Sequence, residues 1–288
     1  MPGYRTPDRL QARIALHERF GPKSEDLHRF QFDHVLRALA AGQGEVHQAD
    51  AAASQRRAVL DVGVGTGRLW QANAERVPAS WDLTLSDASA GMVAEAGRML
   101  NRTGLPGRAI EADASELPFA DASFDLVFAN HMLYHVPDIE RAVSELRRVL
   151  KRDGLLYAAT NGAQHLALLR VPMRELADLA PELTVDGTLP LRFELESGGD
   201  LLRTAFAHVE RVDRFDELIV TAVEPLMAYL WSVVHLPEPV EPDLEERVRR
   251  WDVATRERFE KALETGPVRV GRAAGFFVAH GTPNEPNP

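Results

Sequence analysis

Three glycines at alternate positions follow a short apolar run and form the strongest chemical signal in the chain. The run 58–62 leads into Gly63, Gly65 and Gly67, after which a helical pattern begins. Glycine lets the backbone turn sharply and approach a ligand closely, because it has no Cβ atom. The first N–H groups of the following helix can bind an anionic group. This loop therefore predicts a ligand site at the end of a strand.

The same loop separates two classes of nucleotide ligand. The dinucleotide pattern G-x-G-x-x-G requires its third glycine at a position that Arg68 occupies in this chain. An arginine there counts against a pyrophosphate packed tightly on the helix. A nicotinamide-dependent oxidoreductase is therefore the weaker interpretation.

Two carboxylates follow the next two predicted strands. Asp87 comes after the run 81–85, where an acid can accept hydrogen bonds from both hydroxyls of a ribose. Asp113 comes after 107–111, where it can accept a hydrogen bond from an exocyclic amine. Because open α/β sheets bind ligands at the carboxyl ends of parallel strands, both acids and the glycine loop are expected at one edge. Together they predict a site for an adenosine with a carboxylate-containing tail, although each acid alone is equally well explained as a cap or turn residue.

Two histidines follow the fourth predicted strand, 124–129. His131 and His135 lie four residues apart, a spacing that would place both on one face of a helix. Either histidine could act as a general base, or the two could only line a pocket or cap a turn. Two histidines at this spacing could also ligate a metal, but no clear carboxylate partner accompanies them, so no metal site is predicted.

The elements that must position these residues alternate between strands and helices. Strands are predicted at 58–62, 81–85, 107–111, 124–129 and 155–160, and helices at 67–76, 90–100 and 138–150, with a turn at 153–154. Such alternation implies parallel strands joined by right-handed crossovers. The expected fold class is α/β, a Rossmann-like doubly wound sheet of seven strands, mostly parallel with the last strand antiparallel.

Composition excludes several kinds of protein. The chain has 288 residues, a net charge of −10 and no cysteine, so disulfides, cysteine-ligated zinc and thiolate nucleophiles are absent. A chain with this negative net charge lacks the excess of positive charge that binding to a phosphate backbone needs, so nucleic-acid binding is not expected. No apolar run approaches the roughly 18–20 residues that span a membrane, and no secretory signal is visible. We therefore expect a cytoplasmic protein without a membrane span that acts on a small molecule.

On these motifs, the stretch 58–160 resembles a class I S-adenosylmethionine-dependent methyltransferase of the small-molecule type, grouped with ubiquinone- and menaquinone-biosynthesis methyltransferases. Residues 61–67 resemble its first motif, 85–92 its second, 113–119 its adenine motif and 124–136 its fourth-strand motif. The resemblance implies S-adenosylmethionine as cofactor and a small-molecule acceptor with an O, N or C nucleophile. The implied cofactor-binding residues are Asp61, Gly63, Gly65, Gly67, Asp87, Ala88, Met92, Asp113, Ala114 and Asn130.

The resemblance gives some of these residues distinct roles. Met92 would flank the adenine, and Asn130 would contact the methionine end of the cofactor. Asp61 would align the loop or reach the cofactor's amino group through water. Where the acceptor starts protonated, His135 or His131 would remove the proton.

The chain is divided into four parts on this basis. They are a helical extension or lid at 1–55, an S-adenosylmethionine-binding core at 56–160, the C-terminal half of the sheet with helical acceptor-binding insertions at 161–281, and a disordered tail at 282–288. Ser24 is predicted as a helix N-cap, and 41–55 as a linker. The third part is expected to hold helices at 161–190, 198–206, 224–234 and 243–264 and strands at 208–220 and 275–280.

Other functions remain open at this point. A non-catalytic or regulatory protein of the same fold would carry the same cofactor motifs. A nucleic-acid methyltransferase would show a basic face or an Asn-Pro-Pro-aromatic motif after the fourth strand, where this chain has Asn130 followed by His-Met-Leu. The acceptor and the oligomeric state are not determined by the sequence.

Overall fold

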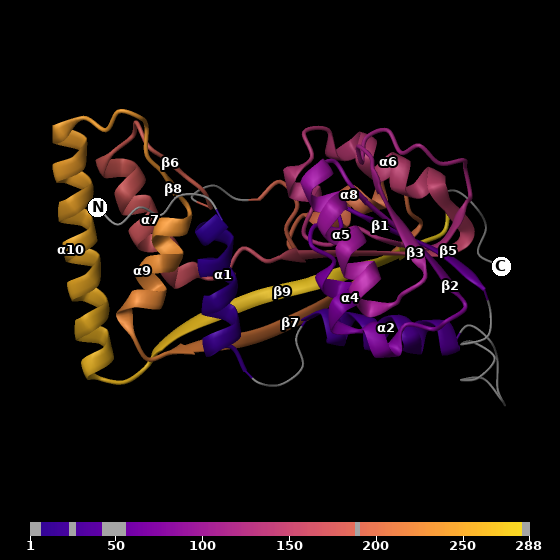
Figure 1. Cartoon of the computed structure of the whole chain (residues 1–288), viewed down its shortest axis with the longest axis horizontal. Coiled ribbons are helices and arrows are strands. Elements are labelled where there is room, and N and C mark those ends of the chain that lie inside the picture. The colour runs from indigo at the N-terminus through magenta and orange to yellow at the C-terminus, as the bar shows by residue number, and fades with distance from the viewer. Residues whose placement is uncertain (1–6, 23–26, 42–55, 188–190, 284–288) are drawn as a thin grey trace. The chain divides into compact units, whose positions relative to one another are not determined.

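The chain folds into two compact units, each described here by itself. The computed structural model describes residues 7–22, 27–41, 56–187 and 191–283. The sheet unit comprises 25–162, 192–214 and 274–288, and the helical unit comprises 1–24, 163–191 and 215–273. Figure 1 labels the elements of both units. The predicted N-cap Ser24, residues 42–55 of the predicted linker 41–55 and the end of the tail, 284–288, lie outside the described residues.

A seven-stranded sheet runs in the order β3-β2-β1-β4-β5-β9-β7. Its strands are β1 (Arg57–Val62), β2 (Trp81–Asp87), β3 (Gly107–Glu111), β4 (Phe124–Phe128), β5 (Leu150–Asn161), β7 (His208–Val220) and β9 (Val268–His280). Strands β1 to β5 pair in parallel, and β9 pairs antiparallel with β5. The predicted Rossmann-like α/β fold is therefore confirmed. The strand order reverses between β1 and β4, and open α/β sheets bind ligands at such a point.

Helices cover both faces of the sheet. They are α2 (Leu27–Ala41), α4 (Arg68–Ala72), α5 (Ala90–Thr103), α6 (Ile139–Val149) and α8 (Gly198–Arg203). One apolar core joins α6 and α8 to the sheet, and the other joins α2, α4 and α5 to the opposite face. Residues alternate between these cores along β1, where Val59 belongs to one and Leu60 to the other. This doubly buried pattern is typical of a parallel strand with helices on both sides.

Helix α6 illustrates how the local sequence builds this packing. Asp138 caps it, because its carboxylate accepts a hydrogen bond from the backbone N–H of Arg141 at 3.0 Å. Its buried side chains follow helical spacing and are Ile139, Ala142, Val143, Leu146 and Val149. Complete burial of a large aliphatic side chain contributes about 1.5–3 kcal/mol, so this stripe fixes the helix to the sheet.

The helical unit has its own apolar core. Its elements are α1 (Pro7–Phe20), α7 (Ala167–Leu179), α9 (Val223–Ser232), α10 (Pro242–Glu264) and the antiparallel pair β6 (Thr184–Val185) and β8 (Val234–His235), together with the adjoining parts of β7 and β9. In Figure 1, α7, α9 and α10 gather around a common centre. The indole N–H of Trp251 on α10 donates to the carbonyl of Pro172 on α7 at 2.8 Å. Within the described residues, no helix is long and apolar enough to cross a membrane.

Several element boundaries differ from the sequence prediction. The predicted turn at 153–154 lies inside β5, where a register shift against β4 near Phe124 accommodates it. The last strand begins at Val268 instead of 275, because Arg269 and Arg272 pair with acids of β7. The predicted helix 67–76 is divided into α4 and the 3-10 turn Ala74–Arg76.

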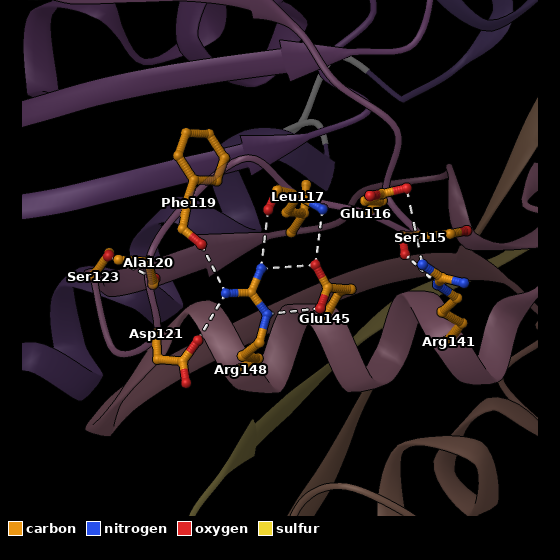
Figure 2. A network of polar contacts seen from close by, with 10 residues as sticks. All are labelled: Ser115, Glu116, Leu117, Phe119, Ala120, Asp121, Ser123, Arg141, Glu145 and Arg148. Atoms are coloured by element: carbon orange, nitrogen blue, oxygen red, sulfur yellow. Dashed lines mark hydrogen bonds and ion pairs between the residues drawn. The ribbon is translucent and has the colours of Figure 1, made fainter.

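A polar network fixes the loop between β3 and β4 against α6 (Figure 2). The Arg148 guanidinium donates to both oxygens of Glu145 at 2.7 and 2.8 Å and to the carbonyls of Leu117 and Phe119 at 2.9 and 2.7 Å. Glu145 in turn accepts from the backbone N–H of Leu117 at 2.8 Å. Bonding to Arg148 lowers the pKa of Glu145. The loop that follows Asp113 is therefore held by α6.

Replacing Arg148 by methionine should lower the free energy of unfolding by about 2 kcal/mol, because hydrogen bonds to a charged group are lost at two loop carbonyls and at Glu145. Urea denaturation followed by circular dichroism measures this change. The matched control is Arg102→Met on the exposed surface of α5, which should change stability by less than about 0.5 kcal/mol. Equal losses in the two variants would contradict a stabilising role for the network.

Candidate functional site

The glycine loop adopts a backbone that other residues rarely adopt. Gly63, Gly65 and Gly67 have φ angles of +67°, +55° and +77°. A Cβ atom at Gly63 would lie 2.6 Å from the Cβ of Met132, whereas at Gly65 it would meet nothing within 4 Å. The loop is therefore in close contact with Met132 at Gly63, and no atom of the described residues occupies the corresponding space at Gly65. An open backbone of this kind leaves room for the close approach of a ligand.

Asp87 at the end of β2 binds this loop directly. Its Oδ2 accepts from the backbone N–H of Gly65 and its Oδ1 from that of Ser89, both at 2.9 Å. The backbone N–H of Ala112, just past β3, donates to the Asp87 carbonyl at 3.0 Å. The ends of β1, β2 and β3 are thus joined by hydrogen bonds. Each carboxylate oxygen has a further lone pair, so Asp87 can also accept from a diol.

The other residues predicted around an adenine lie along the same edge. Asp113 is exposed, and its Oδ1 accepts from the backbone N–H of Ser115 at 2.7 Å, while Ala114 is buried. Ala88 is exposed, and Met92 is half-buried in the first turn of α5. Their contacts to an adenine stay predictions.

Asp61 is the most deeply buried acid of the site, with 3% of its surface exposed. Its Oδ2 accepts from the indole N–H of Trp70 at 2.8 Å, and its Oδ1 has no hydrogen-bond partner among the described residues. Burial raises the pKa of Asp61 to about 7; the Trp70 hydrogen bond lowers it and the charge of Asp87 raises it further. A buried carboxylate oxygen without a partner is suited to a cationic ligand group.

Asn130, directly after Ala129 at the end of β4, forms a reciprocal amide pair with Gln31 of α2. Gln31 Nε2 donates to Asn130 Oδ1 at 2.9 Å, and Asn130 Nδ2 donates to Gln31 Oε1 at 3.0 Å. Asn130 Oδ1 also accepts from the backbone N–H of Ala159 at 3.2 Å. Gln31 is 1% exposed. Sequence reasoning missed this glutamine, because it lies 99 residues from its partner and no motif marks it.

The two histidines do not share a helical face, and this part of the prediction is wrong. His131 lies before the 3-10 turn Leu133–His135 and has a left-handed φ of +54°. Its backbone N–H donates to the carbonyl of Ala159 at 2.8 Å, which anchors it beside β5. His135 is exposed and its ring lies 4.5 Å from that of Tyr134. In the part of the chain that the structure describes, no group of three or more His, Asp or Glu side chains could hold a metal ion.

Comparison with known proteins agrees with this geometry. The family model described as "Methyltransferase domain" matches residues 60–158. These residues hold the glycine loop, Asp87, Asp113 and Asn130. By this match, residues 60–158 are a methyltransferase domain. This match supports S-adenosylmethionine as the cofactor, as predicted.

Curated relatives of the methyltransferase domain differ in the acceptor that they methylate. The chain is 34% identical over 175 residues to a malonyl-[acyl-carrier protein] O-methyltransferase of Geobacter sulfurreducens, covering 61% of this chain and 64% of the relative. It is 37% identical over 98 residues to the ubiquinone/menaquinone biosynthesis C-methyltransferase UbiE of Idiomarina loihiensis, covering 33% of this chain and 39% of the relative. The chain therefore spans between about two fifths and two thirds of the length of these relatives.

Solved structures show the same fold at low identity. The YcgJ protein of Bacillus subtilis superposes with a TM-score of 0.52 at 19% identity, over 87% of this chain and 99% of that chain. A protein of Bacillus halodurans superposes with a TM-score of 0.51 at 16% identity, over 85% and 97% of the two chains. At such identity the likeness concerns the fold alone.

The methyltransferase domain has features that fit S-adenosylmethionine. The open side of Gly65 leaves room for the cofactor beside the loop. The spare lone pairs of Asp87 suit the ribose diol, and the unpartnered Asp61 Oδ1 suits the cationic amino group. These three features are properties of this chain and do not depend on the relatives.

We expect Gln31→Leu to weaken S-adenosylmethionine binding about tenfold, because two hydrogen bonds that orient the Asn130 amide are lost. Isothermal titration calorimetry measures the dissociation constant. The control is the same substitution in an Asn130→Ala background, where it should have little further effect. If Gln31→Leu weakens binding equally in both backgrounds, Gln31 acts through packing and not through Asn130.

The raised pKa of Asp61 predicts a pH-dependent stability. Because the folded-state pKa of about 7 exceeds the ordinary value of 3.8, folded protein binds the proton more tightly, so the Asp61 contribution falls as pH rises from about 4 to 7. Asp61→Asn keeps an acceptor for the Trp70 hydrogen bond but cannot ionise, so the pH-dependent decrease in stability disappears. The stability of the variant relative to the natural protein should rise across that window by roughly 4 kcal/mol and then level off. Urea denaturation between pH 4 and pH 8 measures it, and a difference independent of pH contradicts the prediction.

Proposed function

We propose that this chain is an S-adenosylmethionine-dependent methyltransferase that transfers a methyl group to an O, N or C nucleophile of a small molecule. The main support is the hydrogen bond from Gly65 to Asp87 beside the buried oxygen of Asp61, within a methyltransferase domain. Curated relatives of the chain are methyltransferases by name, which supports the same activity.

The proposed roles of the cofactor-binding residues follow from their chemistry. Asp87 accepts the ribose hydroxyls, Asp113 accepts from the exocyclic amine of adenine, and Asp61 faces the amino group. Ala88, Met92 and Ala114 flank the adenine, Gly63, Gly65 and Gly67 leave space for the cofactor, and Asn130 holds its methionine end. When bound, S-adenosylmethionine supplies a methyl group on a positively charged sulfur.

The protein contributes mainly positioning to such a transfer. An acceptor atom must be held in line, about 3–3.5 Å from the methyl carbon, and water must be excluded. His131 or His135 removes a proton where the acceptor atom starts protonated, and a pre-ionised or carbon acceptor needs no base. Relatives named as an O- and as a C-methyltransferase support both kinds of acceptor.

The acceptor-binding role of the remaining residues is also a proposal. The segments 161–195 and 221–264 and the N-terminal helices lie outside the family match at 60–158. We assign them to acceptor recognition because relatives that share the domain act on different acceptors by name. The part 56–160 is the cofactor-binding core in this proposal.

Two alternatives differ in what they require of the chain. A non-catalytic protein of this fold would bind the cofactor but form no S-adenosylhomocysteine with any acceptor. A nucleic-acid methyltransferase is disfavoured by the net charge of −10. A malonyl thioester on acyl-carrier protein and a demethylmenaquinone, the acceptor classes in the names of relatives, are the first acceptors to test. A cytoplasmic location stays a prediction.

Calorimetric titration with S-adenosylmethionine, S-adenosylhomocysteine and NAD tests the assignment. Binding of the first two without NAD is expected, and Asp87→Ala should weaken both at least about tenfold, because hydrogen bonds to a charged group are lost. The matched control is Asp82→Ala, an exposed position on the same strand. Unchanged affinity in Asp87→Ala would refute the site, and binding of NAD alone would redirect the assignment to hydride transfer.

A further inference from the structure

A cavity of about 580 Å³ lies in the sheet unit, away from the glycine loop. The residues lining it include Leu155 of β5, His208 at the start of β7 and His280 at the end of β9. Leu156 of β5 pairs with Ala279 of the antiparallel β9, so His280 at the end of β9 lies toward the amino ends of the parallel strands. The cavity therefore opens at the amino edge of the parallel strands, and the cofactor site lies at the carboxyl edge. Its volume is within the range of about 300–1,000 Å³ that is typical of small-molecule sites.

The cavity lies on the face of the sheet that α2 covers. Tyr157 of β5 pairs with Val278 of β9, and both belong to the apolar core that contains α2. His34 of α2 lines the cavity, and its Nδ1 lies 3.2 Å from the hydroxyl of Tyr157. Leu155 and Val278 supply an apolar wall.

Titratable side chains gather on the remaining wall. The rings of His208 and His280 stack with centroids 4.7 Å apart and planes 24° apart. Burial lowers the pKa of both His34 and His280 below the usual value of 6.5, with the charge of His208 lowering the latter further. At neutral pH the imidazoles of His34 and His280 are therefore neutral, and each has one ring nitrogen that can accept a hydrogen bond.

One carboxylate in this wall, Glu210, takes part in no ion pair among the described residues. Within that part of the chain it forms no hydrogen bond either. Burial raises the pKa of Tyr157, and the charge of Glu210 raises it further. The same charge opposes the lowering of the His34 pKa, whereas the charge of Arg37 adds to that lowering. Arg203, the arginine of the lining, donates instead to Asp200 at 2.7 Å. The cavity thus combines an unpaired negative charge, neutral nitrogen acceptors and an apolar wall.

We propose that this cavity binds a small organic ammonium ion. Its charged nitrogen pairs with Glu210 and donates to the neighbouring imidazoles, and its apolar body lies against Leu155 and Val278. The residues that line the cavity favour an ammonium ion over an anion, because Arg203 is paired with Asp200 and Glu210 would repel a negative charge. The site is independent of the proposed methyl transfer.

Three ligands of matched size and different charge test this proposal: benzylammonium, benzyl alcohol and benzoate. Calorimetry should detect saturable binding of benzylammonium by the full chain, with benzyl alcohol weaker and benzoate weakest. Glu210→Gln should weaken benzylammonium binding about two- to fivefold. Glu140→Gln, an exposed position at the start of α6, is the matched control and should leave binding unchanged.

A titration of each variant with S-adenosylmethionine serves as an independent check of folding. Glu210 is exposed, so its substitution should leave that affinity unaltered. Preference for benzoate, or equal benzylammonium binding in Glu210→Gln and in the natural protein, would overturn the proposal. Absence of saturable binding by any of the three would overturn it as well. None of these outcomes depends on turnover, so they do not bear on the methyltransferase assignment.

Discussion

The hydrogen bond from the Gly65 N–H to the Asp87 carboxylate is the contact on which the cofactor site depends. Ordering a loop with left-handed glycines at three alternate positions has a large entropic cost, because glycine has many conformations in the unfolded chain. A charged acceptor at the end of the neighbouring strand offsets part of that cost. The same carboxylate keeps lone pairs for a ligand. One residue thus orders the loop and supplies a binding group.

Two polar side chains near this loop, Asp61 and Asn130, are each held by a hydrogen bond from a helix. Asp61 lies on β1, and Asn130 lies two residues beyond the end of the adjacent β4. Each has a specific partner from a helix, Trp70 for Asp61 and Gln31 for Asn130. A buried polar atom without a partner is costly, so Asp61 is stable chiefly in its protonated form. A cationic ligand group near Asp61 would favour its charged form instead. The proposed role of Asp61 therefore implies that cofactor binding and the protonation of this acid are linked.

The edges of one sheet carry different chemistry. At the carboxyl edge, backbone N–H groups and acids converge because parallel strands end there together. At the amino edge, the antiparallel β9 ends and β7 begins, which brings His280 beside His208. The strand order, and not the local sequence, creates this second cluster. This second cluster contains a carboxylate and imidazoles, whereas the glycine loop presents backbone N–H donors.

The sequence by itself determined the alternation of strands and helices, the glycine loop and the acids after β2 and β3, because hydrophobic periodicity and turn residues are local properties. It predicted β3 and β7 with their observed bounds, since polar or turn residues delimit both. Only the tertiary structure decided that Gln31 meets Asn130 and that His131 lies outside a helix. It also decided that β9 begins at Val268, where cross-strand ion pairs extend it. These features depend on contacts between residues far apart in the sequence, and the side-chain periodicity of one segment cannot predict such contacts.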